Sequence, residues 1–203
     1  MRTGPRPGAV DPSRRAAMTA KRSSRKRSTI MDAGQLERAL TRMAHQIIEA
    51  TEGAKEIALV GMQTRGVDLA QRLSRLIKES AGREVPVGVL DVTLYRDDFR
   101  NREKTPEVRP SDIPFEVDGR TLILVDDVLY TGRTVRAALD SLMDYGRPRK
   151  ICLAVLIDRG HRELPIRPDF TGQEVKTAGD EEILVRVVEH DDEDAVYLVE
   201  APE

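Results

Sequence analysis

The stretch Leu122–Thr134 reads LILVDDVLYTGRT: an apolar run, two adjacent carboxylates, and then a hydroxyl-rich turn with one glycine. Residues Thr121–Val125 are β-branched or apolar without a polar break, which is typical of a strand covered on both faces of a parallel sheet. Beyond the turn, apolar residues recur at helical spacing. This order predicts a strand, a turn and a helix, with Asp126 and Asp127 at the carboxyl end of the strand, where open α/β sheets bind ligands.

The residue types in this stretch suit a ribose 5-phosphate. Carboxylates repel phosphate, so Asp126 and Asp127 are better suited to accept hydrogen bonds from two neighbouring ribose hydroxyls, directly or through a divalent cation. Thr131 and Thr134 offer hydroxyls to a single phosphate, and Gly132 permits close approach of the backbone. Unpaired N–H groups and the dipole at the start of a helix also favour an anion there.

Other nucleotide motifs fit this stretch less well. A Walker loop ends in Gly-Lys-Ser/Thr and a dinucleotide fingerprint needs three spaced glycines, and neither occurs here. An Asp-Asp pair after a strand is also found as a helix cap or as the magnesium pocket of phospho-acceptor domains. The pair alone leaves that alternative open, whereas the complete run is more specific.

A second strand, turn and helix precede the first. Ile57–Val60 is apolar, Gly61–Gly66 follows as a tight turn, and apolar residues at helical spacing come next. This turn predicts a second anion cradle, in which Arg65 adds a fixed positive charge and two glycines let the backbone approach a ligand. An ordinary turn between a strand and a helix would also explain the glycines.

The thirteen-residue run resembles the motif with which type I phosphoribosyltransferases bind phosphoribosyl pyrophosphate (PRPP). Residues 93–98 (TLYRDD) and 156–167 (LIDRGHRELPIR) are similar to members of that family that regulate bacterial pyrimidine genes and are also uracil phosphoribosyltransferases. Together with Thr41-Arg42 and Thr64-Arg65-Gly66, the resemblance covers about residues 33–200.

The resemblance implies an α/β fold of the type I phosphoribosyltransferase kind, with a central, mostly parallel sheet flanked by helices and a small hood. It implies that Mg²⁺ accompanies PRPP near Asp126 and Asp127, indirectly or through PRPP, that these carboxylates are the catalytic residues, and that Thr64, Arg65 and Gly66 hold pyrophosphate. The residues expected to bind PRPP are Leu122, Ile123, Leu124, Val125, Asp126, Asp127, Val128, Leu129, Tyr130, Thr131, Gly132, Arg133 and Thr134.

Two further segments are expected to cover the site. Residues 95–116 form a long polar connection, and loops of this length are usually functional or disordered. The resemblance implies a lid here, and the chemistry gives it a purpose, because water would intercept the oxocarbenium-like species of ribosyl transfer. Arg96 would move with it to meet pyrophosphate, unless it pairs with a neighbouring Asp. A hood is expected at about 158–182, where Asp158 and Arg159 would read the uracil edge; a stabilising Arg-carboxylate network is the alternative.

The resemblance also implies binding of a messenger-RNA leader. Thr41 and Arg42 lie on the polar side of a predicted amphipathic helix that ends near Gly53, and they match the family's RNA-binding pair. A solvated helix face is the default explanation. Residues 173–180 lack the positive charge of the family pattern, which would weaken RNA binding.

Composition indicates one folded domain with a basic tail. The chain has 203 residues, with one Cys and no Trp. Residues 1–28 carry nine Lys or Arg and one Asp, a net charge of +8, whereas the remaining 24 basic and 34 acidic residues give −10. We expect residues 1–30 to be a disordered extension and 31–203 to be the domain. The tail is open to three interpretations: a nucleic-acid-binding arm, a transit-like sequence, or a dispensable extension with a start at Met18 or Met31.

The sequence thus predicts a cytoplasmic enzyme that makes UMP and pyrophosphate from uracil and PRPP, and that regulates pyrimidine genes by binding an mRNA leader in response to UMP or UTP. A homodimer or higher homo-oligomer is expected, and no stretch is apolar enough for a membrane span. The alternatives are a phosphoribosyltransferase without RNA regulation and one that acts on a purine base.

Overall fold

A computed structural model describes residues 27–93 and 110–200. Most of the basic extension, most of the predicted lid, and Arg96 therefore lie outside the described residues. The elements are β1 (Arg27–Met31), α2 (Ala33–Ala50), β2 (Ile57–Met62), α3 (Arg65–Ala81), β3 (Val87–Leu90), β4 (Thr121–Leu129), α4 (Arg133–Leu142), β5 (Lys150–Asp158), β6 (Phe170–Glu174), β7 (Glu181–Arg186), α5 (Val188–Asp191) and β8 (Ala195–Glu200).

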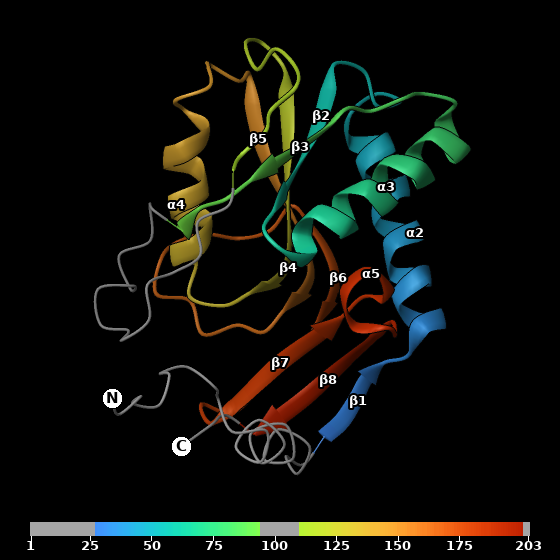
Figure 1. The fold of residues 1–203 in the computed structure, drawn as a ribbon, viewed down its shortest axis with the longest axis vertical. Helices are drawn as coiled ribbons and strands as arrows, with labels where there is room; N and C mark the ends of the chain where they lie inside the picture. The colour runs from blue at the N-terminus through green and yellow to red at the C-terminus, as the bar shows by residue number, and fades with distance from the viewer. Residues whose placement is uncertain (1–26, 94–109, 201–203) are drawn as a thin grey trace, which may run out of the picture.

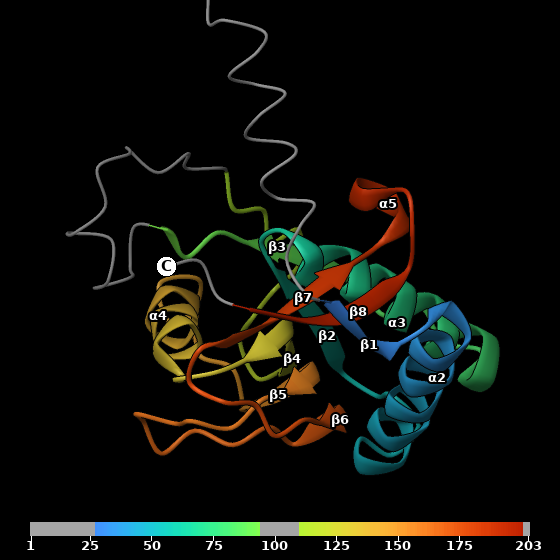
Figure 2. The same ribbon diagram turned by 90° about the horizontal axis from the view of Figure 1, so that it is seen from below.

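The centre of the molecule is a five-stranded parallel sheet in the order β3-β2-β4-β5-β6. Figures 1 and 2 show α4 on one face and α2 and α3 on the other. Side chains alternate along β4: Leu122 and Leu124 pack in the cluster on the α4 side, whereas Ile123 and Val125 pack in the cluster with α2 and α3. The predicted fold class is confirmed, and an almost unbroken apolar run is what a doubly covered strand requires.

A second, smaller sheet lies across the carboxyl end of β4. It has the order β1-β8-β7 and is antiparallel, and Figure 2 shows it in front of the central sheet when the molecule is seen from below. Residues 27–31 pair with β8, so the folded part begins before residue 31, inside the segment predicted to be an extension. The predicted hood, residues 158–182, runs from the end of β5 through β6 to the start of β7.

Two predicted boundaries differ from the structure. Strand β4 does not end before Asp126 but pairs with β5 as far as Leu129, so both carboxylates lie within a strand. The Arg, Pro and Gly residues of the segment from Asp158 to Gly172 predict irregular structure, yet Phe170–Glu174 is a strand that pairs with β5. Its start is hidden in the sequence by nearby Pro and Gly residues, which ordinarily mark turns.

Candidate active site

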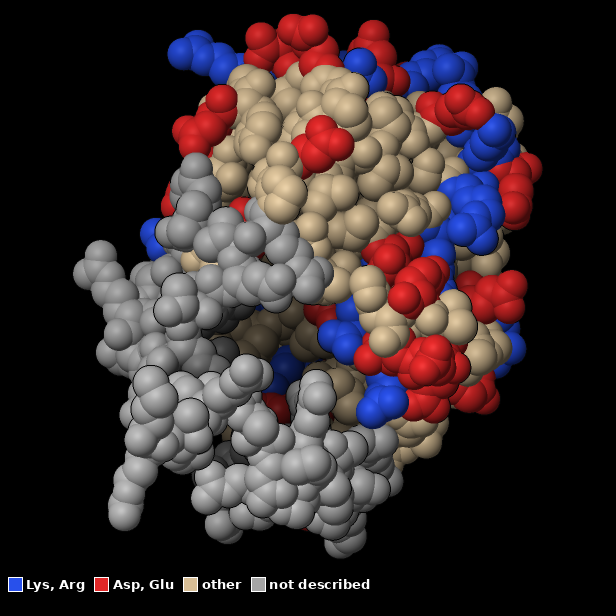
Figure 3. Space-filling model, viewed as in Figure 1, with Lys and Arg blue, Asp and Glu red and all other residues tan. Residues whose placement is uncertain are grey.

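The turn between β4 and α4 forms one wall of a pocket of about 670 Å³. Gly132 is the N-cap residue of α4 and has a φ of 91°, a left-handed conformation that favours glycine. Figure 3 shows a hollow in the middle of the molecular face, with acidic and basic side chains at its wall. The lining residues are Asp126, Val128, Leu129, Tyr130, Thr131, Gly132, Arg133, Thr134, Val135, Arg159, Glu163, Glu182 and Ile183.

The structure therefore brings most of the predicted PRPP residues together around one space. Asp126 and the whole turn from Thr131 to Thr134 line it. Residues Leu122–Val125 do not, because they are buried in the two hydrophobic clusters and serve as the rigid strand beneath the site. The sequence did not single out Glu163, Glu182 and Ile183; the last two come from β7 of the small sheet.

The adjacent carboxylates are fixed by their own backbone. The N–H of Asp127 donates to Asp126 Oδ1 at 2.9 Å, and the N–H of Val128 donates to Asp127 Oδ1 at 2.8 Å. Burial raises the pKa of the Asp127 carboxyl above its ordinary value, against the opposing influence of a hydrogen bond with Asp126 and of the Arg65 charge. Asp127 thus lies toward Arg65, whereas Asp126 lines the pocket.

The turn between β2 and α3 packs directly on β4. A Cβ atom on Gly66 would lie 2.5 Å from the carbonyl oxygen of Val125 and 3.3 Å from Cα of Asp126. Only glycine permits this contact, which sets Thr64-Arg65-Gly66 beside the carboxylate pair. Two anion cradles predicted separately from the sequence thus lie at the same edge of the sheet.

The two residues predicted to read uracil lie in different environments. Arg159 is buried at 6% exposure, lines the pocket, and stacks over Tyr130 with its guanidinium carbon 4.0 Å from the ring centroid. It also donates to the carbonyl oxygen of Glu181 at 2.7 Å, which ties β7 to the end of β5. The carboxylate of Asp158 accepts from Arg162 Nη2 at 2.5 Å and from the N–H of Gly160. Asp158 does not line this pocket, but together with Arg159 it lines a second one of about 470 Å³.

The predicted RNA-binding pair lies away from this pocket, on α2. The Thr41 hydroxyl donates to the carbonyl oxygen of Glu37 at 2.9 Å, within the helix. Arg42 is exposed, and its Nη2 donates to the carbonyl oxygen of Gly172 in β6. Arg42 therefore already links α2 to the edge strand of the central sheet.

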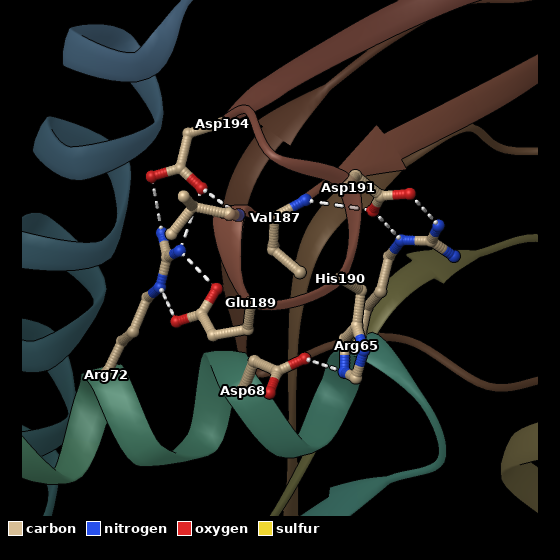
Figure 4. Close-up of polar contacts among 9 residues, drawn as sticks. Arg65, Asp68, Arg72, Val187, Glu189, His190, Asp191 and Asp194 are labelled. Carbon is tan, nitrogen blue, oxygen red and sulfur yellow. Dashed lines mark hydrogen bonds and ion pairs between the residues drawn. The ribbon is translucent and has the colours of Figure 1, made fainter.

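Val187–Asp194, which we call the acidic turn, joins β7 to β8, and the sequence does not predict its contacts with α3. It includes α5 and meets three side chains of α3: Arg65 contacts Asp191, Asp68 contacts His190, and Arg72 contacts Glu189 and Asp194. Figure 4 shows these groups facing one another across the gap between α3 and the turn. The spacing 65, 68 and 72 is that of one helix face, and this was the signal available in the sequence.

The carboxylate pair suits a magnesium ion that arrives with its substrate. Among the described residues, no group of three or more His, Cys, Asp or Glu side chains could hold a metal ion. Magnesium commonly keeps several waters and binds one or two carboxylates together with substrate phosphates. Asp126 and Asp127 fit that second pattern, in which a bound phosphate compound would supply the remaining ligands.

Comparisons with known proteins agree with this geometry. The model of the phosphoribosyl transferase domain family matches residues 26–192. The bifunctional protein PyrR of Thermus aquaticus is 57% identical over 174 residues, which are 86% of this chain and 96% of that protein. The bifunctional protein PyrR of Pelotomaculum thermopropionicum is 54% identical over 180 residues, 89% and 99% of the two chains.

Solved structures share the fold. A hypoxanthine-guanine phosphoribosyltransferase of Bacillus anthracis superposes with a TM-score of 0.65 at 19% identity, covering 85% of this chain and 96% of that one. The enzyme of Leishmania tarentolae in complex with GMP gives 0.65 at 16% identity, covering 87% and 97%. At such identities the likeness concerns the fold alone. In the described residues, no helix is both long enough and apolar enough to span a membrane.

Proposed function

Because the chain belongs to the phosphoribosyl transferase domain family, we propose that it transfers the ribose 5-phosphate of PRPP to uracil, forming UMP and pyrophosphate. The observation that carries this proposal is the meeting of Asp126 and the Thr131–Thr134 turn at one pocket, with Gly66 of the second turn packed on the β4 backbone at Val125 and Asp126. The choice of uracil rests on the similarity to proteins named PyrR.

In this proposal each part of the site has a separate task. The N–H groups and hydroxyls of the turn Thr131–Thr134 bind the 5-phosphate at the start of α4. Asp126 and Asp127 accept hydrogen bonds from the ribose diol and favour the positive charge that develops at the anomeric carbon. The turn Thr64–Gly66 binds pyrophosphate, and magnesium bound with PRPP offsets the charge of that leaving group.

The base and the lid complete the proposed site. Arg159 and Tyr130 form a polar and aromatic wall of the pocket against which uracil can lie. Asp158 fixes Arg162 and Gly160 in the same loop, so its part in base recognition is indirect. Arg96 and the connection 95–116 are proposed to close over the bound substrates and exclude water.

The decisive assay is a comparison of bases. Uracil, hypoxanthine, guanine and orotate are each incubated with PRPP and Mg²⁺, and the nucleotide formed is measured by chromatography. The proposal expects UMP as the main product and dependence on magnesium. A preference for hypoxanthine or guanine would show that the chain is a purine-base transferase with the same PRPP site.

We further propose that the chain regulates pyrimidine genes by binding an mRNA leader, with UMP or UTP increasing the affinity, in the cytoplasm and as a homodimer or higher oligomer. Exposed Arg42 on α2 supports this part. Arg42→Ala should weaken binding of a pyrimidine-gene leader in a filter or gel-shift assay and spare turnover. Equal binding by both forms would remove Arg42 from the interface, and light scattering would give the oligomeric state.

A further inference from the structure

Arg65 is the first residue of α3, and its guanidinium is held along one edge. Its Nε donates to Asp191 Oδ2 at 3.0 Å and its Nη2 donates to Asp191 Oδ1 at 2.9 Å. The two side chains are 29% and 17% exposed. Such a bidentate pair fixes both the position and the plane of the guanidinium, which a single hydrogen bond would not do.

The carboxylate of Asp191 is itself held in place. Its Oδ2 also accepts from the N–H of Val187 at 3.2 Å, within the acidic turn. The turn is anchored to α3 a second time, because Arg72 makes four hydrogen bonds to Glu189 and Asp194, at 2.6 to 2.9 Å. His190 Nε2 lies 3.0 Å from Asp68 Oδ2 as well. Asp191 is therefore presented to Arg65 from a fixed support (Figure 4).

The opposite edge of the guanidinium remains available. Figure 4 shows the third nitrogen, Nη1, directed away from Asp191, and within residues 27–93 and 110–200 it has no hydrogen-bond partner. The charge of Arg65 acts on Asp127, and the next residue, Gly66, packs on the β4 backbone at Val125 and Asp126. The free N–H groups thus lie at the edge of the site where pyrophosphate is proposed to bind.

We propose that Asp191 is a positioning residue for pyrophosphate: by holding Nε and Nη2 of Arg65, it directs Nη1 toward the pyrophosphate group of PRPP. This inference rests on the proposed function, and it extends that function to a residue of the small sheet's β7–β8 connection. A long side chain loses rotamer freedom when it binds a ligand, and one that is already ordered loses less. Asp191 therefore contributes affinity without touching the ligand.

A competing role for Asp191 makes the opposite prediction. If its carboxylate occupied Arg65 in place of pyrophosphate, removing the charge would free the guanidinium and tighten binding. The bidentate pair uses only one edge of the planar group, so a phosphate oxygen and Asp191 can be bound at the same time. This geometry favours positioning over competition.

The test measures pyrophosphate and Mg·PRPP binding to the full chain by calorimetry, together with the KM for PRPP and kcat. Asp191→Asn keeps the acceptor for Val187 but loses the charged bidentate pair. It should raise the KM for PRPP and the Kd for pyrophosphate about tenfold, with kcat changed less than twofold. Asp191→Glu, which restores the charge, should recover part of the affinity.

Asp194→Asn is the matched control, because it removes a carboxylate from the same turn that pairs with Arg72 and not with Arg65. It should leave the affinity for pyrophosphate unchanged even if it lowers the melting temperature. Arg65→Ala should weaken pyrophosphate binding, and the double variant Arg65→Ala/Asp191→Asn should be no weaker than Arg65→Ala.

The possible outcomes distinguish a failure of the positioning role of Asp191 from a failure of the proposed function. Binding of Mg·PRPP by the unmodified chain with unchanged or tighter binding in Asp191→Asn would overturn the positioning role and leave the proposed function standing. An equal loss in Asp194→Asn would show that only the fold of the turn matters. No binding of Mg·PRPP by the unmodified chain would remove the proposed function and this inference with it. If Asp191→Asn failed to fold, Asp191→Glu and the Arg65→Ala background would decide the matter.

Discussion

The two strand-to-helix turns at the site are built in different ways. The β4–α4 turn holds its functional groups within the stretch Leu122–Thr134, and its special conformation comes from Gly132 within that stretch. The β2–α3 turn depends on distant parts of the chain: Gly66 packs on β4, and Arg65 is oriented by Asp191, 126 residues away. A local motif can therefore specify one half of a site while long-range contacts specify the other half.

The largest effect is expected when a charge is removed from the local stretch Leu122–Thr134. Asp127→Asn should lower kcat about 100-fold, because the carboxylate that favours positive charge on the ribose is lost. Burial raises the pKa of Asp127, so the acid limb of the pH–rate profile should lie above the range of an ordinary Asp, and the variant should lack this limb. Steady-state rates across pH measure both effects.

The same pKa shift predicts that Asp127→Asn, which lowers activity, does not lower stability at neutral pH. When the pKa of a carboxyl is higher in the folded than in the unfolded chain, the free energy of unfolding decreases as pH rises through the folded pKa. Asp127→Asn removes this cost and should melt at the same temperature as the unmodified chain, or higher, at neutral pH. An unfolded Asp127→Asn variant would contradict this stability prediction, and a folded variant with unchanged turnover would remove Asp127 from the mechanism.

The next change tests the long-range packing of the other turn. In Gly66→Ala the new Cβ would meet the backbone of Val125 at 2.5 Å, so β4 or α3 must shift. The free energy of unfolding should fall by about 1–3 kcal/mol, and the KM for PRPP should rise because the two cradles move apart. Urea denaturation and steady-state kinetics measure the two effects.

Gly34→Ala is the control for Gly66→Ala. Gly34 lies in the first turn of α2, where a Cβ would meet the flexible end of Arg38 at 3.2 Å and, in ordinary van der Waals contact, Asp32 Oδ1 at 3.5 Å. Alanine in a helix is favoured over glycine by about 0.5–1 kcal/mol, so this variant should be as stable as the unmodified chain or more stable. Equal destabilisation by both substitutions would mean that the close approach of Gly66 to β4 has no special importance.

The same distinction explains what the sequence predicted. The fold class, the central strands β2 and β4, and the β4–α4 turn follow from hydrophobic patterns and from a motif of consecutive residues. The strand β6 does not follow from the sequence, because Gly172 belongs to a segment rich in Arg, Pro and Gly. In the structure Gly172 lets β6 approach β5, since a Cβ there would collide with the carbonyl oxygen of Leu156. A glycine selected for close packing and one selected for a turn look the same in a sequence.

The acidic turn could not be placed from the sequence for a related reason. Asp191 and Asp194 follow a strand and resemble an ordinary solvated turn, and nothing local names their partners on α3. The pairing of β1 with β8 was not predicted either, because β1 lies far from β7 and β8 in the sequence and contributes only five residues. Pairings between such short, distant segments leave little periodic signal.

Arg72→Ala separates the support of the acidic turn from its action on the site. Arg72 is 14% exposed and bridges Glu189 and Asp194, so its removal leaves two partly buried carboxylates without their cation. The free energy of unfolding should fall by about 1–3 kcal/mol. Arg75 lies on the exposed side of the same helix, and Arg75→Ala should lower the free energy of unfolding by less than about 0.5 kcal/mol. Thermal and urea unfolding measure both, and similar losses would contradict the bridging role.

The smallest expected effect is the pH dependence of stability that comes from Glu189 in the acidic turn. The hydrogen bond from Arg72 lowers the pKa of Glu189, and a carboxyl with a lower pKa in the folded chain contributes stability that is lost as pH falls through the folded value. Glu189→Gln should therefore destabilise the chain at neutral pH, and the difference should vanish at acidic pH. Glu84→Gln is the control: Lys78 lowers the pKa of Glu84 too, but this pair is fully exposed and screened by solvent. A pH-dependent loss as large in Glu84→Gln would mean that the contacts of the acidic turn with α3 are no stronger than an ordinary surface pair.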